Sequence, residues 1–328
     1  MKIKKTVKIP ENIEINPAFE NNSVAIALSS SDFFVPYLTT TLYSLIKNAD
    51  MKKNYDIVIF TKDIQEQNKK IINNFLSKSN VSIRFVNVIE TFGDLKLHTD
   101  ADVTIETYFR LIVPFVMKKY EKVLFLDSDL IIQSNICELY DIDLKNYPLA
   151  ASVECLMSAL IGRLGSYMLK YLKDVLKLKE IDKYFQAGVM LFNIKLFNEK
   201  NYGQTLLNMV ANYNYKIVDQ DALNELFKGN ILFIPTEWNY VPMQKHMKEL
   251  KYVENMSDEI REKYLAVKNP KIIHFADKGK PWYDISEKGA WNFWKYAIKT
   301  PFFNTIVLRL LQKTFRKLIL FYKIQRKI

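Results

Sequence analysis

The sequence predicts an α/β protein in which helices cover both faces of a mainly parallel central sheet. Short runs rich in valine and isoleucine alternate with helical stretches over the first half of the chain, an order typical of such sheets. The 328 residues are 49% hydrophobic, enough for a large core, and no linker rich in glycine, serine or proline divides them. We therefore expect one domain, 23–299, between an N-terminal arm, 1–22, and a C-terminal tail, 300–328.

The expected elements alternate regularly in the first half of the chain and less regularly in the second. Strands are predicted at 24–29, 56–60, 81–86, 122–127 and 130–132, and helices at 37–47, 64–77 and 104–117. Further strands are predicted at 187–192, 231–235 and 271–275, and further helices at 156–178 and from about Asp221 onward. Parallel α/β sheets bind ligands beyond the carboxyl ends of their strands, so we expect a site just after Ser29 and at Asp127.

The composition argues against several classes of protein. The two cysteines, Cys137 and Cys155, provide no disulfide framework and no CxxC pair for zinc, which suits a reducing compartment. No glycine-rich phosphate loop follows the first strand, as a nicotinamide dehydrogenase or a P-loop enzyme would require. The net charge of +11 arises mainly after Glu287, where ten Lys or Arg and no acid occur. The remaining body shows no basic and aromatic pattern for nucleic acid, so we expect no nucleic-acid partner.

The sequence shows no signal for export or for a membrane span. Residues 1–10 are basic, but the apolar stretch of about 7–15 residues that a secretory signal needs does not follow. No apolar run reaches the roughly 18 residues that a transmembrane helix requires. We therefore expect a cytoplasmic protein.

The first candidate site is Asp127-Ser128-Asp129, which lies between two apolar strands. Carboxylates two residues apart at a strand end can turn toward one cation, and divalent ions held by one or two carboxylates often take their other oxygens from a diphosphate. A solvated turn is the alternative for an isolated Asp-x-Asp. The buried strand before Asp127 favours the metal site.

The second candidate site is the segment from His274 to Lys280, which follows the strand predicted at 271–275. Imidazole can complete a site for a transition metal such as manganese, and the lysine can neutralise phosphate charge as a flexible cation. The alternative for His274 alone is a buried histidine of the core, next to a surface loop.

Together, these two segments resemble the family 8 retaining glycosyltransferases, which include lipopolysaccharide galactosyl- and glucosyltransferases and glycogenin. The resemblance extends from about Val24 to Trp282. Three further segments match the family's order: Thr107-Tyr-Phe-Arg110-Leu, Phe185-Gln186-Ala187-Gly188-Val-Met-Leu-Phe-Asn193 and Asp219-Gln220-Asp221-Ala-Leu-Asn224. The resemblance implies a GT-A-type fold and the use of a UDP-sugar with Mn²⁺, or Mg²⁺ as the alternative.

The resemblance also implies roles for individual residues. Metal ligands are implied at Asp127, Asp129 and His274, and a wider donor-binding set is implied at Ser29, Ser31, Phe34, Arg110, Asp127, Ser128, Asp129, Gln186, Ala187, His274, Asp277 and Lys280. Catalytic roles are implied for Gln220, Asp219 and Glu154; Gln220 is assigned a stabilising role toward the cationic sugar, and a carboxylate in that role is the alternative. The alternatives for Arg110, Asp219 and Gln220, each taken singly, are a helix-surface arginine and helix-capping polar residues.

Two departures from the family pattern concern the donor. Ser31 stands where an acid is usual near the uracil, and Phe34 replaces a stacking tyrosine, although its ring still offers an aromatic face. Gln186 stands where asparagine is usual, and the extra methylene can change which hexose fits.

The expected function is transfer of glucose or galactose from UDP-glucose or UDP-galactose to a lipo-oligosaccharide, lipopolysaccharide or other surface glycan or glycolipid. A glycogenin-like initiator that glucosylates protein and a sugar-nucleotide nucleotidyltransferase are the alternatives. The second lacks support because the loop after the first strand is neither glycine-rich nor arginine-bearing. The sequence does not fix the oligomeric state.

The tail predicts an amphipathic helix. Its basic side carries Arg309, Lys313, Arg316, Lys317, Lys323 and Lys327, and its apolar side carries Phe303, Val307, Leu311, Phe315, Leu318 and Tyr322. The basic side is interrupted by Ile306, Leu320 and Ile324. Because each Lys or Arg near an anionic membrane adds about 1 kcal/mol, we expect the protein to lie peripherally on the inner face of the cytoplasmic membrane. Packing of this helix on the domain or on a second subunit is the alternative.

Overall fold

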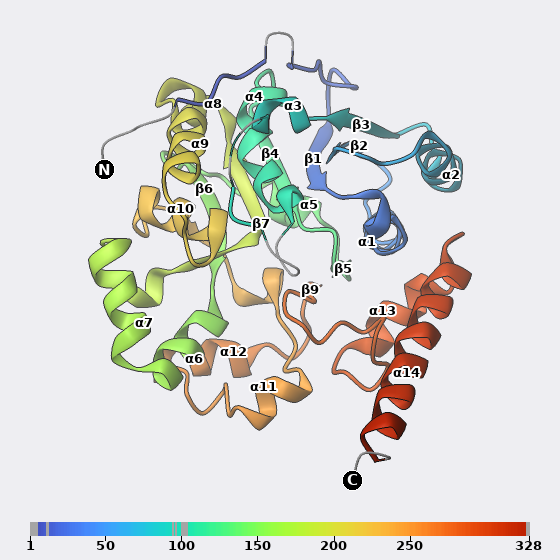
Figure 1. Cartoon of the computed structure of the whole chain (residues 1–328). Coiled ribbons are helices and arrows are strands. Elements are labelled where there is room, and N and C mark those ends of the chain that lie inside the picture. Colours follow the sequence, from blue (N-terminus) through green and yellow to red (C-terminus); the bar gives the residue numbers. More distant parts are fainter. Residues whose placement is uncertain (1–5, 11–12, 94, 96, 100–103, 326–328) are drawn as a thin grey trace.

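The computed structural model of the chain describes all residues except 1–5, 11–12, 94, 96, 100–103 and 326–328, and it describes only the backbone of 317–325. Figure 1 shows a central sheet with helices packed around it. The polypeptide then continues into a smaller sheet and a group of short helices before a long C-terminal helix.

The central sheet orders its strands β3-β2-β1-β4-β7-β6-β8 in the described part of the chain. Its strands are β1 (Ser23–Ser29), β2 (Asn54–Thr61), β3 (Val81–Asn87), β4 (Lys122–Leu126), β6 (Leu149–Val153), β7 (Phe185–Asn193) and β8 (Leu232–Phe233). The pairs β3-β2, β2-β1, β1-β4 and β6-β8 are parallel, whereas β7 runs antiparallel to both β4 and β6. The prediction of a mainly parallel α/β sheet is confirmed.

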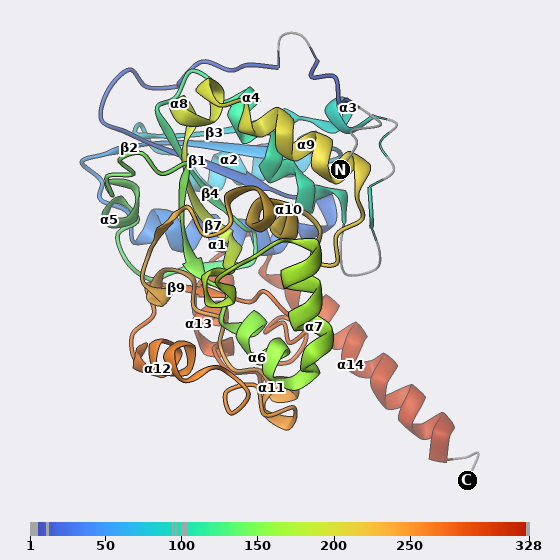
Figure 2. The same cartoon turned by 90° about the vertical axis from the view of Figure 1, so that its left-hand side faces the viewer.

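Most side chains of the central strands are buried, as their continuous apolar runs predict. Figure 2 shows α1 on one face of the sheet and α4, α8 and α9 on the other, so helices cover both faces. The first-half helices are α1 (Val35–Lys47), α2 (Glu66–Leu76), α3 (Ile89–Phe92), α4 (Val113–Val116) and α5 (Cys137–Tyr140), with 3₁₀ turns at Asp32–Phe34 and Ile105–Ile112.

The second half of the chain forms mostly short helices. They are α6 (Cys155–Leu164), α7 (Ser166–Lys170), α8 (Ile194–Glu199), α9 (Tyr202–Asn212), α10 (Val218–Phe227), α11 (Lys245–Glu249), α12 (Asp258–Ala266), α13 (Ala290–Ala297) and α14 (Phe303–Gln325). A π turn covers Tyr171–Val175, and 3₁₀ turns cover Ile181–Lys183 and Thr236–Asn239.

A second, two-stranded sheet positions the candidate site. Strand β5 (Leu130–Ile132) pairs antiparallel with β9 (Ile272–His274), and the register places Leu130 opposite His274. The N–H of Phe275 donates to the carbonyl of Asp129 at 3.0 Å. Two segments about 145 residues apart in sequence are therefore held together by backbone hydrogen bonds.

Several predicted elements differ from the structure. The helix expected at 104–117 is a 3₁₀ turn followed by α4, which begins at Val113 with a proline at its second position. The helix expected at 156–178 breaks at Gly165, which has φ of 57°. The strand expected at 231–235 contains only Leu232–Phe233, the helix expected from Asp221 begins at Val218, and strand β6 was not predicted.

The C-terminal helix begins against the domain and then extends away from it, as Figure 2 shows. Phe302 and Ile306 are buried, the latter in a cluster with Tyr37 and Phe293. The guanidinium of Arg309 lies over the ring of Phe33, 4.0 Å from its centroid, and donates to the carbonyl of the same residue at 2.6 Å. The first turns of α14 therefore pack on the domain, and the boundary at residue 300 stays a prediction.

The far half of the tail prediction cannot be compared with side-chain positions. The side chains of Lys317, Leu318, Leu320, Tyr322, Lys323 and Ile324, and the whole of Lys327, lie outside the described residues. No helix in the described part of the chain combines the length and the apolar character that crossing a membrane requires.

Candidate active site

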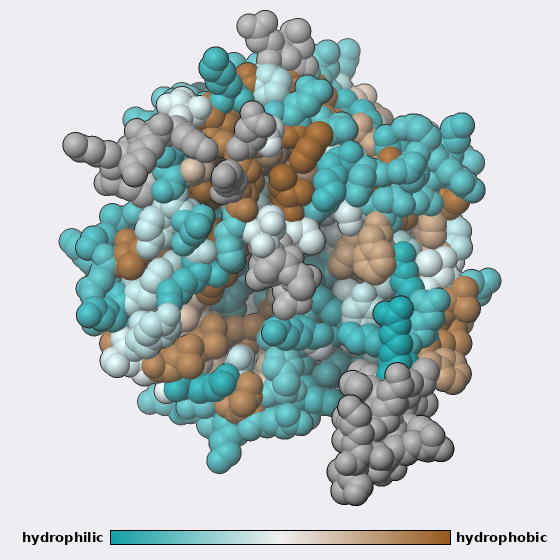
Figure 3. All heavy atoms as spheres, in the orientation of Figure 1, coloured by the Kyte–Doolittle hydropathy of each residue, from teal (hydrophilic) through white to brown (hydrophobic). Residues whose placement is uncertain are grey.

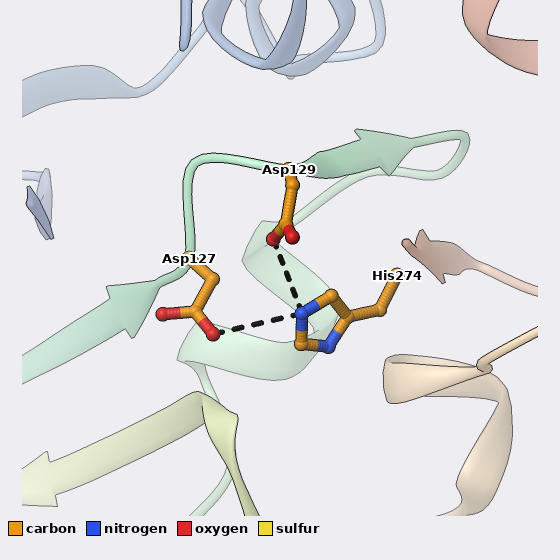
Figure 4. Close-up of side chains that lie close together, drawn as sticks. All are labelled: Asp127, Asp129 and His274. Atoms are coloured by element: carbon orange, nitrogen blue, oxygen red, sulfur yellow. Dashed lines mark ion pairs between the residues drawn. The ribbon is translucent and has the colours of Figure 1, made fainter. Parts of the chain in front are cut away.

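The candidate site forms where β4 and β9 end. Asp127 follows β4 directly. Its N–H donates to the carbonyl of Gly188 at 2.8 Å, and this bond holds the residue after β4 against the neighbouring strand β7. In Figure 4 the carboxylates of Asp127 and Asp129 both point toward the ring of His274. Nε2 of His274 lies 3.1 Å from Oδ1 of Asp129 and 3.5 Å from Oδ2 of Asp127. The sequence prediction that these three residues come together is confirmed.

These three residues could hold a metal ion. Their ligand atoms all lie within 4.8 Å of one another. Two carboxylates and one imidazole suit a divalent ion such as manganese. The backbone beneath them also leaves room for these side chains, because a Cβ at Gly188 would lie 2.3 Å from Cε1 of His274 and 2.6 Å from Oδ2 of Asp127. The observed arrangement therefore fits a metal ion and requires glycine at position 188.

The orientation of His274 is set by a residue that the sequence analysis missed. Nδ1 of the ring lies 2.8 Å from Oδ1 of Asn239 and 3.3 Å from Nε2 of Gln186; the shorter contact is to an amide oxygen, which only accepts, and it favours the tautomer with the proton on Nδ1. Nε2 then keeps its lone pair for a metal ion. The amide of Asn239 is itself held, since it donates to Oε1 of Gln186 at 2.6 Å. No motif surrounds Asn239, which reaches the site only through the 3₁₀ turn before β9.

Lys280 and Arg110 provide positive charge beside the carboxylates of Asp129 and Asp127. Nζ of Lys280 donates to Oδ2 of Asp129 at 2.8 Å. Burial alone would raise the pKa of Asp129, but the charge and the hydrogen bond of Lys280, together with the neighbouring His274, outweigh it and hold this pKa well below its usual range. For Asp127 burial prevails over the charge of Arg110, so its pKa is raised.

Arg110 is almost wholly engaged within the protein. Nη2 donates to Oδ1 of Asp127 at 3.0 Å, and Nη1 donates to the carbonyl of Ala187 at 2.6 Å. Nε lies 2.9 Å from Oδ2 of Asp219, and the guanidinium lies over the ring of Phe125. The sequence prediction places Arg110 beside the donor, and in the structure it fixes three of the groups expected there.

The segment expected beneath the sugar is anchored by Gln220. Its Oε1 accepts from the N–H of Ala187 at 2.9 Å, and its Nε2 donates to the hydroxyl of Tyr184 at 3.4 Å. The same hydroxyl donates to Asp221 at 2.6 Å. Asp221 also accepts from Tyr171 and from the N–H of Ile217. Both oxygens of Asp221 are thus occupied by protein donors, which indicates a structural role for this carboxylate.

Glu154 and Asp219 are the two carboxyls with strongly raised pKa values. Burial raises the pKa of Glu154 to about 7, against hydrogen bonds from the N–H of Leu156 and from Gln220. Burial likewise raises the pKa of Asp219 to about 7, opposed by the charge of Arg110. Oδ2 of Asp219 is buried and ion-paired with Nε of Arg110 at 2.9 Å, although no contact from the described residues has the geometry of a hydrogen bond to it. Carboxyls shifted in this way are common where protons or sugar hydroxyls are handled.

The residues expected around the base lie together at the end of β1. The hydroxyl of Ser128 donates to the carbonyl of Ser29 at 2.6 Å, and Ser31 precedes the 3₁₀ turn that carries Phe34. The ring of Phe34 packs edge-on against Trp282, with centroids 5.8 Å apart. The ring of Phe34 is half-buried.

The side chain of Asp277 has its hydrogen-bond partner outside the cluster of Asp127, Asp129 and His274. Its Oδ2 lies 2.9 Å from Nε2 of His246, on α11. Its backbone remains in the loop between β9 and Lys280. The predicted donor contact of Asp277 stays a prediction, and the structure gives it a partner elsewhere.

The family model of glycosyl transferase family 8 matches residues 25–286 of the chain. A Haemophilus influenzae protein assigned as a glycosyltransferase is 30% identical over 266 residues, which cover 80% of this chain and 74% of that protein. The lipopolysaccharide 1,2-glucosyltransferase of Escherichia coli is 25% identical over 197 residues, covering 58% of this chain and 53% of that protein.

Solved structures show the same fold. The WbbM bifunctional glycosyltransferase has a TM-score of 0.83 at 30% identity and matches 91% of this chain, which spans about half (53%) of the WbbM chain. The galactosyltransferase LgtC, solved with donor and acceptor sugar analogues, has a TM-score of 0.64 at 25% identity and covers 85% of this chain and 96% of its own. The GT-A-type fold implied by the sequence is therefore confirmed.

Proposed function

The chain belongs to glycosyl transferase family 8, and on this premise we propose that it transfers glucose or galactose from a UDP-sugar to a lipopolysaccharide, lipo-oligosaccharide or other surface glycan, with retention. The observation that carries this proposal is the convergence of Asp127, Asp129 and His274 beside Lys280. The lipopolysaccharide glucosyltransferase and LgtC among the similar proteins support the class of donor and acceptor.

The charged residues account for departure of the nucleotide. Asp127, Asp129 and His274 would hold Mn²⁺, which when bound compensates negative charge on the diphosphate of the leaving UDP. Lys280 supplies a second positive charge from a flexible side chain. It is paired with Asp129 at 2.8 Å, close enough for a diphosphate oxygen at the cluster to share it.

The hexose would lie over the segment 186–188. Oδ2 of Asp219, which is ion-paired with Arg110 but accepts no hydrogen bond of good geometry from the described residues, is suited to accept one from a sugar hydroxyl. Gln220 holds the backbone of Ala187 through its amide oxygen, so it would stabilise the cationic sugar by its dipole and by positioning this segment. Glu154, with its pKa near 7, is suited to accept the proton of an acceptor hydroxyl.

The proposal is tested by measuring UDP release from UDP-glucose and UDP-galactose with and without Mn²⁺. Asp129→Asn should abolish turnover, because it removes a metal ligand and a partner of Lys280. Gln220→Ala should lower turnover and leave Mn²⁺ binding unchanged. Asp258→Asn, which alters an exposed aspartate paired with Arg261, is the matched control. Equal rates for Asp129→Asn and the parent protein would refute the metal assignment.

We propose further that the exposed side of α14 rests on the inner face of the cytoplasmic membrane. Leu308, Leu311 and Phe315 are 58%, 46% and 60% exposed, although α14 packs on the domain through Ile306. The described first half of this helix shows hydrophobic surface on its outer edge at the right of Figure 3. Anionic lipid suits a segment that is basic and free of acids.

Cosedimentation with phosphatidylglycerol vesicles tests the membrane proposal. Replacement of Leu308, Leu311 and Phe315 by serine should release the protein from the vesicles and leave the buried Phe302 and Ile306 in place. The matched control replaces three exposed apolar residues elsewhere by serine: Leu250, Leu265 and Ile285. Unchanged sedimentation of the α14 variant would exclude this contact.

A further inference from the structure

A cavity of about 630 Å³ lies behind strand β9. Its wall includes Ile273, whereas the next side chain along the strand, His274, points to the carboxylates of Asp127 and Asp129. Successive side chains of a strand point to opposite faces. The cavity is therefore separated from the candidate metal cluster by the two-stranded sheet of β5 and β9, and no group that handles the transferred sugar lines it.

The rim of the cavity is positively charged. Lys268, Lys288 and Lys295 line it, from the loop before β9 and from around α13. Among the described residues that line it there is no aspartate or glutamate. An anion that enters would meet three ammonium groups, each a flexible point charge, and no opposing carboxylate.

The inner wall suits a ring that bears hydroxyl groups. The buried side chains of Tyr240 and Tyr296 line it together with the amides of Asn48, Gln133 and Asn292. Aromatic faces and amides of this kind offer flat apolar area beside donors and acceptors. A volume of about 300–1,000 Å³ is usual for sites of small ligands.

The polar groups of this wall are already held in place. Nδ2 of Asn292 donates to Oε1 of Gln133 at 2.6 Å, and Nζ of Lys295 approaches the same oxygen at 3.3 Å. Nε2 of Gln133 donates to the carbonyl of Pro270 at 2.9 Å. The network joins the end of β5, the loop before β9 and α13. A ligand would therefore find an arrangement that needs little ordering on binding.

We propose that this cavity is a second glycan-binding site that takes an anionic saccharide, a sugar ring bearing a phosphate or a carboxylate. The lysines would bind the anionic group, and the tyrosines and amides would bind the ring and its hydroxyls. The site does not depend on the transferase chemistry, because β9 separates the two. It would hold a charged part of a glycan at a distance from the sugar that is transferred.

NMR titration of the ¹⁵N-labelled full chain tests the proposal. Glucose 6-phosphate and glucuronic acid should both shift the side-chain amide signals of Asn292 and Gln133, whereas glucose and inorganic phosphate should bind at least tenfold more weakly. Replacing Lys268, Lys288 and Lys295 by alanine should weaken binding of both anionic sugars at least tenfold. The charge-matched control replaces three exposed lysines elsewhere, Lys173, Lys200 and Lys248, and should bind as the parent does.

Glucose 6-phosphate and glucuronic acid distinguish a site for phosphate from a site for carboxylate. Binding of one and not the other still supports the site and identifies its anion as phosphate or carboxylate. Absence of both shifts, binding of inorganic phosphate as tight as that of glucose 6-phosphate, or equal binding by the lysine variant would overturn the proposal. Circular dichroism confirms that the variants are folded. The titration uses no donor and no turnover, so its failure is distinct from failure of the transferase proposal.

Discussion

Gly188→Ala is the substitution whose effect the geometry defines most sharply. An added Cβ would lie 2.3 Å from Cε1 and 2.9 Å from Nδ1 of His274, and 2.6 Å from Oδ2 of Asp127. Non-bonded carbon atoms pack at about 3.5–4.0 Å, so the imidazole must move by roughly 1 Å or more. Metal sites tolerate deviations of only about 0.2 Å in ligand distance. The substitution should therefore remove at least one ligand from the cluster.

The expected loss is at least about 100-fold in affinity for Mn²⁺, since changes to groups that only orient a ligand already cost about 10–100-fold. Calorimetric titration of Mn²⁺ in the presence of UDP measures it, and UDP release should fall in parallel. Gly203→Ala is the control, because its Cβ would lie 2.7 Å from Phe115, remote from the cluster. Both variants should lose about 1–3 kcal/mol of stability from overpacking. Parent-like Mn²⁺ affinity in Gly188→Ala would show that His274 and Asp127 do not act as ligands here.

Three further substitutions test the surroundings of the cluster. Asn239→Leu should lower Mn²⁺ affinity about 10–100-fold by freeing the ring of His274, measured by the same titration; an unchanged affinity would contradict the assigned tautomer. Lys280→Met should weaken UDP binding by the roughly 1.5–3 kcal/mol of a charged hydrogen bond, measured by calorimetry with Mn²⁺ present, and an equal Kd would exclude the phosphate contact. Glu154→Gln should alter the pH dependence of urea unfolding. Because burial raises the pKa of Glu154 from 4.5 to about 7, its stabilising contribution is complete below about pH 4.5 and is lost as pH rises through 7, by at most about 3 kcal/mol. The variant should gain stability relative to the parent between pH 5 and 8, and a pH-independent difference would refute the shift.

The strands that could be predicted are those with an apolar sequence that are also buried in the sheet. β1, β2 and β4 are continuous apolar runs, rich in isoleucine, valine or leucine, and each is buried within the parallel part of the sheet. β6 escaped prediction because Leu149-Ala-Ala-Ser-Val153 has little β-branched character, and it exists because β7 and β8 pair with it on either side.

The predicted helices differ from the observed ones at positions where a single residue changes the backbone conformation. The apolar pattern of 156–178 continues past Gly165, yet the positive φ of that glycine ends α6. In 104–117 the hydrophobic spacing suits any helix, and the early proline of α4 marks where the 3₁₀ turn gives way to α-helix. Periodicity alone does not distinguish these cases.

The residues of the site divide in the same way. Asp127, Asp129 and His274 could be found because they stand at strand ends, where ligands of α/β sheets bind. Their meeting could not be deduced from spacing, since it depends on the pairing of β5 with β9. Asn239 left no sequence signal, because a single amide in a short turn acquires its role only through the fold.

Arg110 and Lys280 were both predicted to contact the donor, but the charges around them indicate different roles. The carboxyls of Asp127, Asp129 and Asp219 lie in one largely buried site, and charges of this kind require partners. Arg110 forms ion pairs with Asp127 and Asp219, donates to a backbone carbonyl and lies over an aromatic ring. If Arg110 moved away, both buried carboxylates would lose their positively charged partner. Lys280 contacts Asp129, a backbone carbonyl and the ring of Trp282, and its ammonium group is carried on a flexible four-carbon chain. Arg110 therefore maintains the geometry of the site, and Lys280 is the cation that can move to an incoming phosphate.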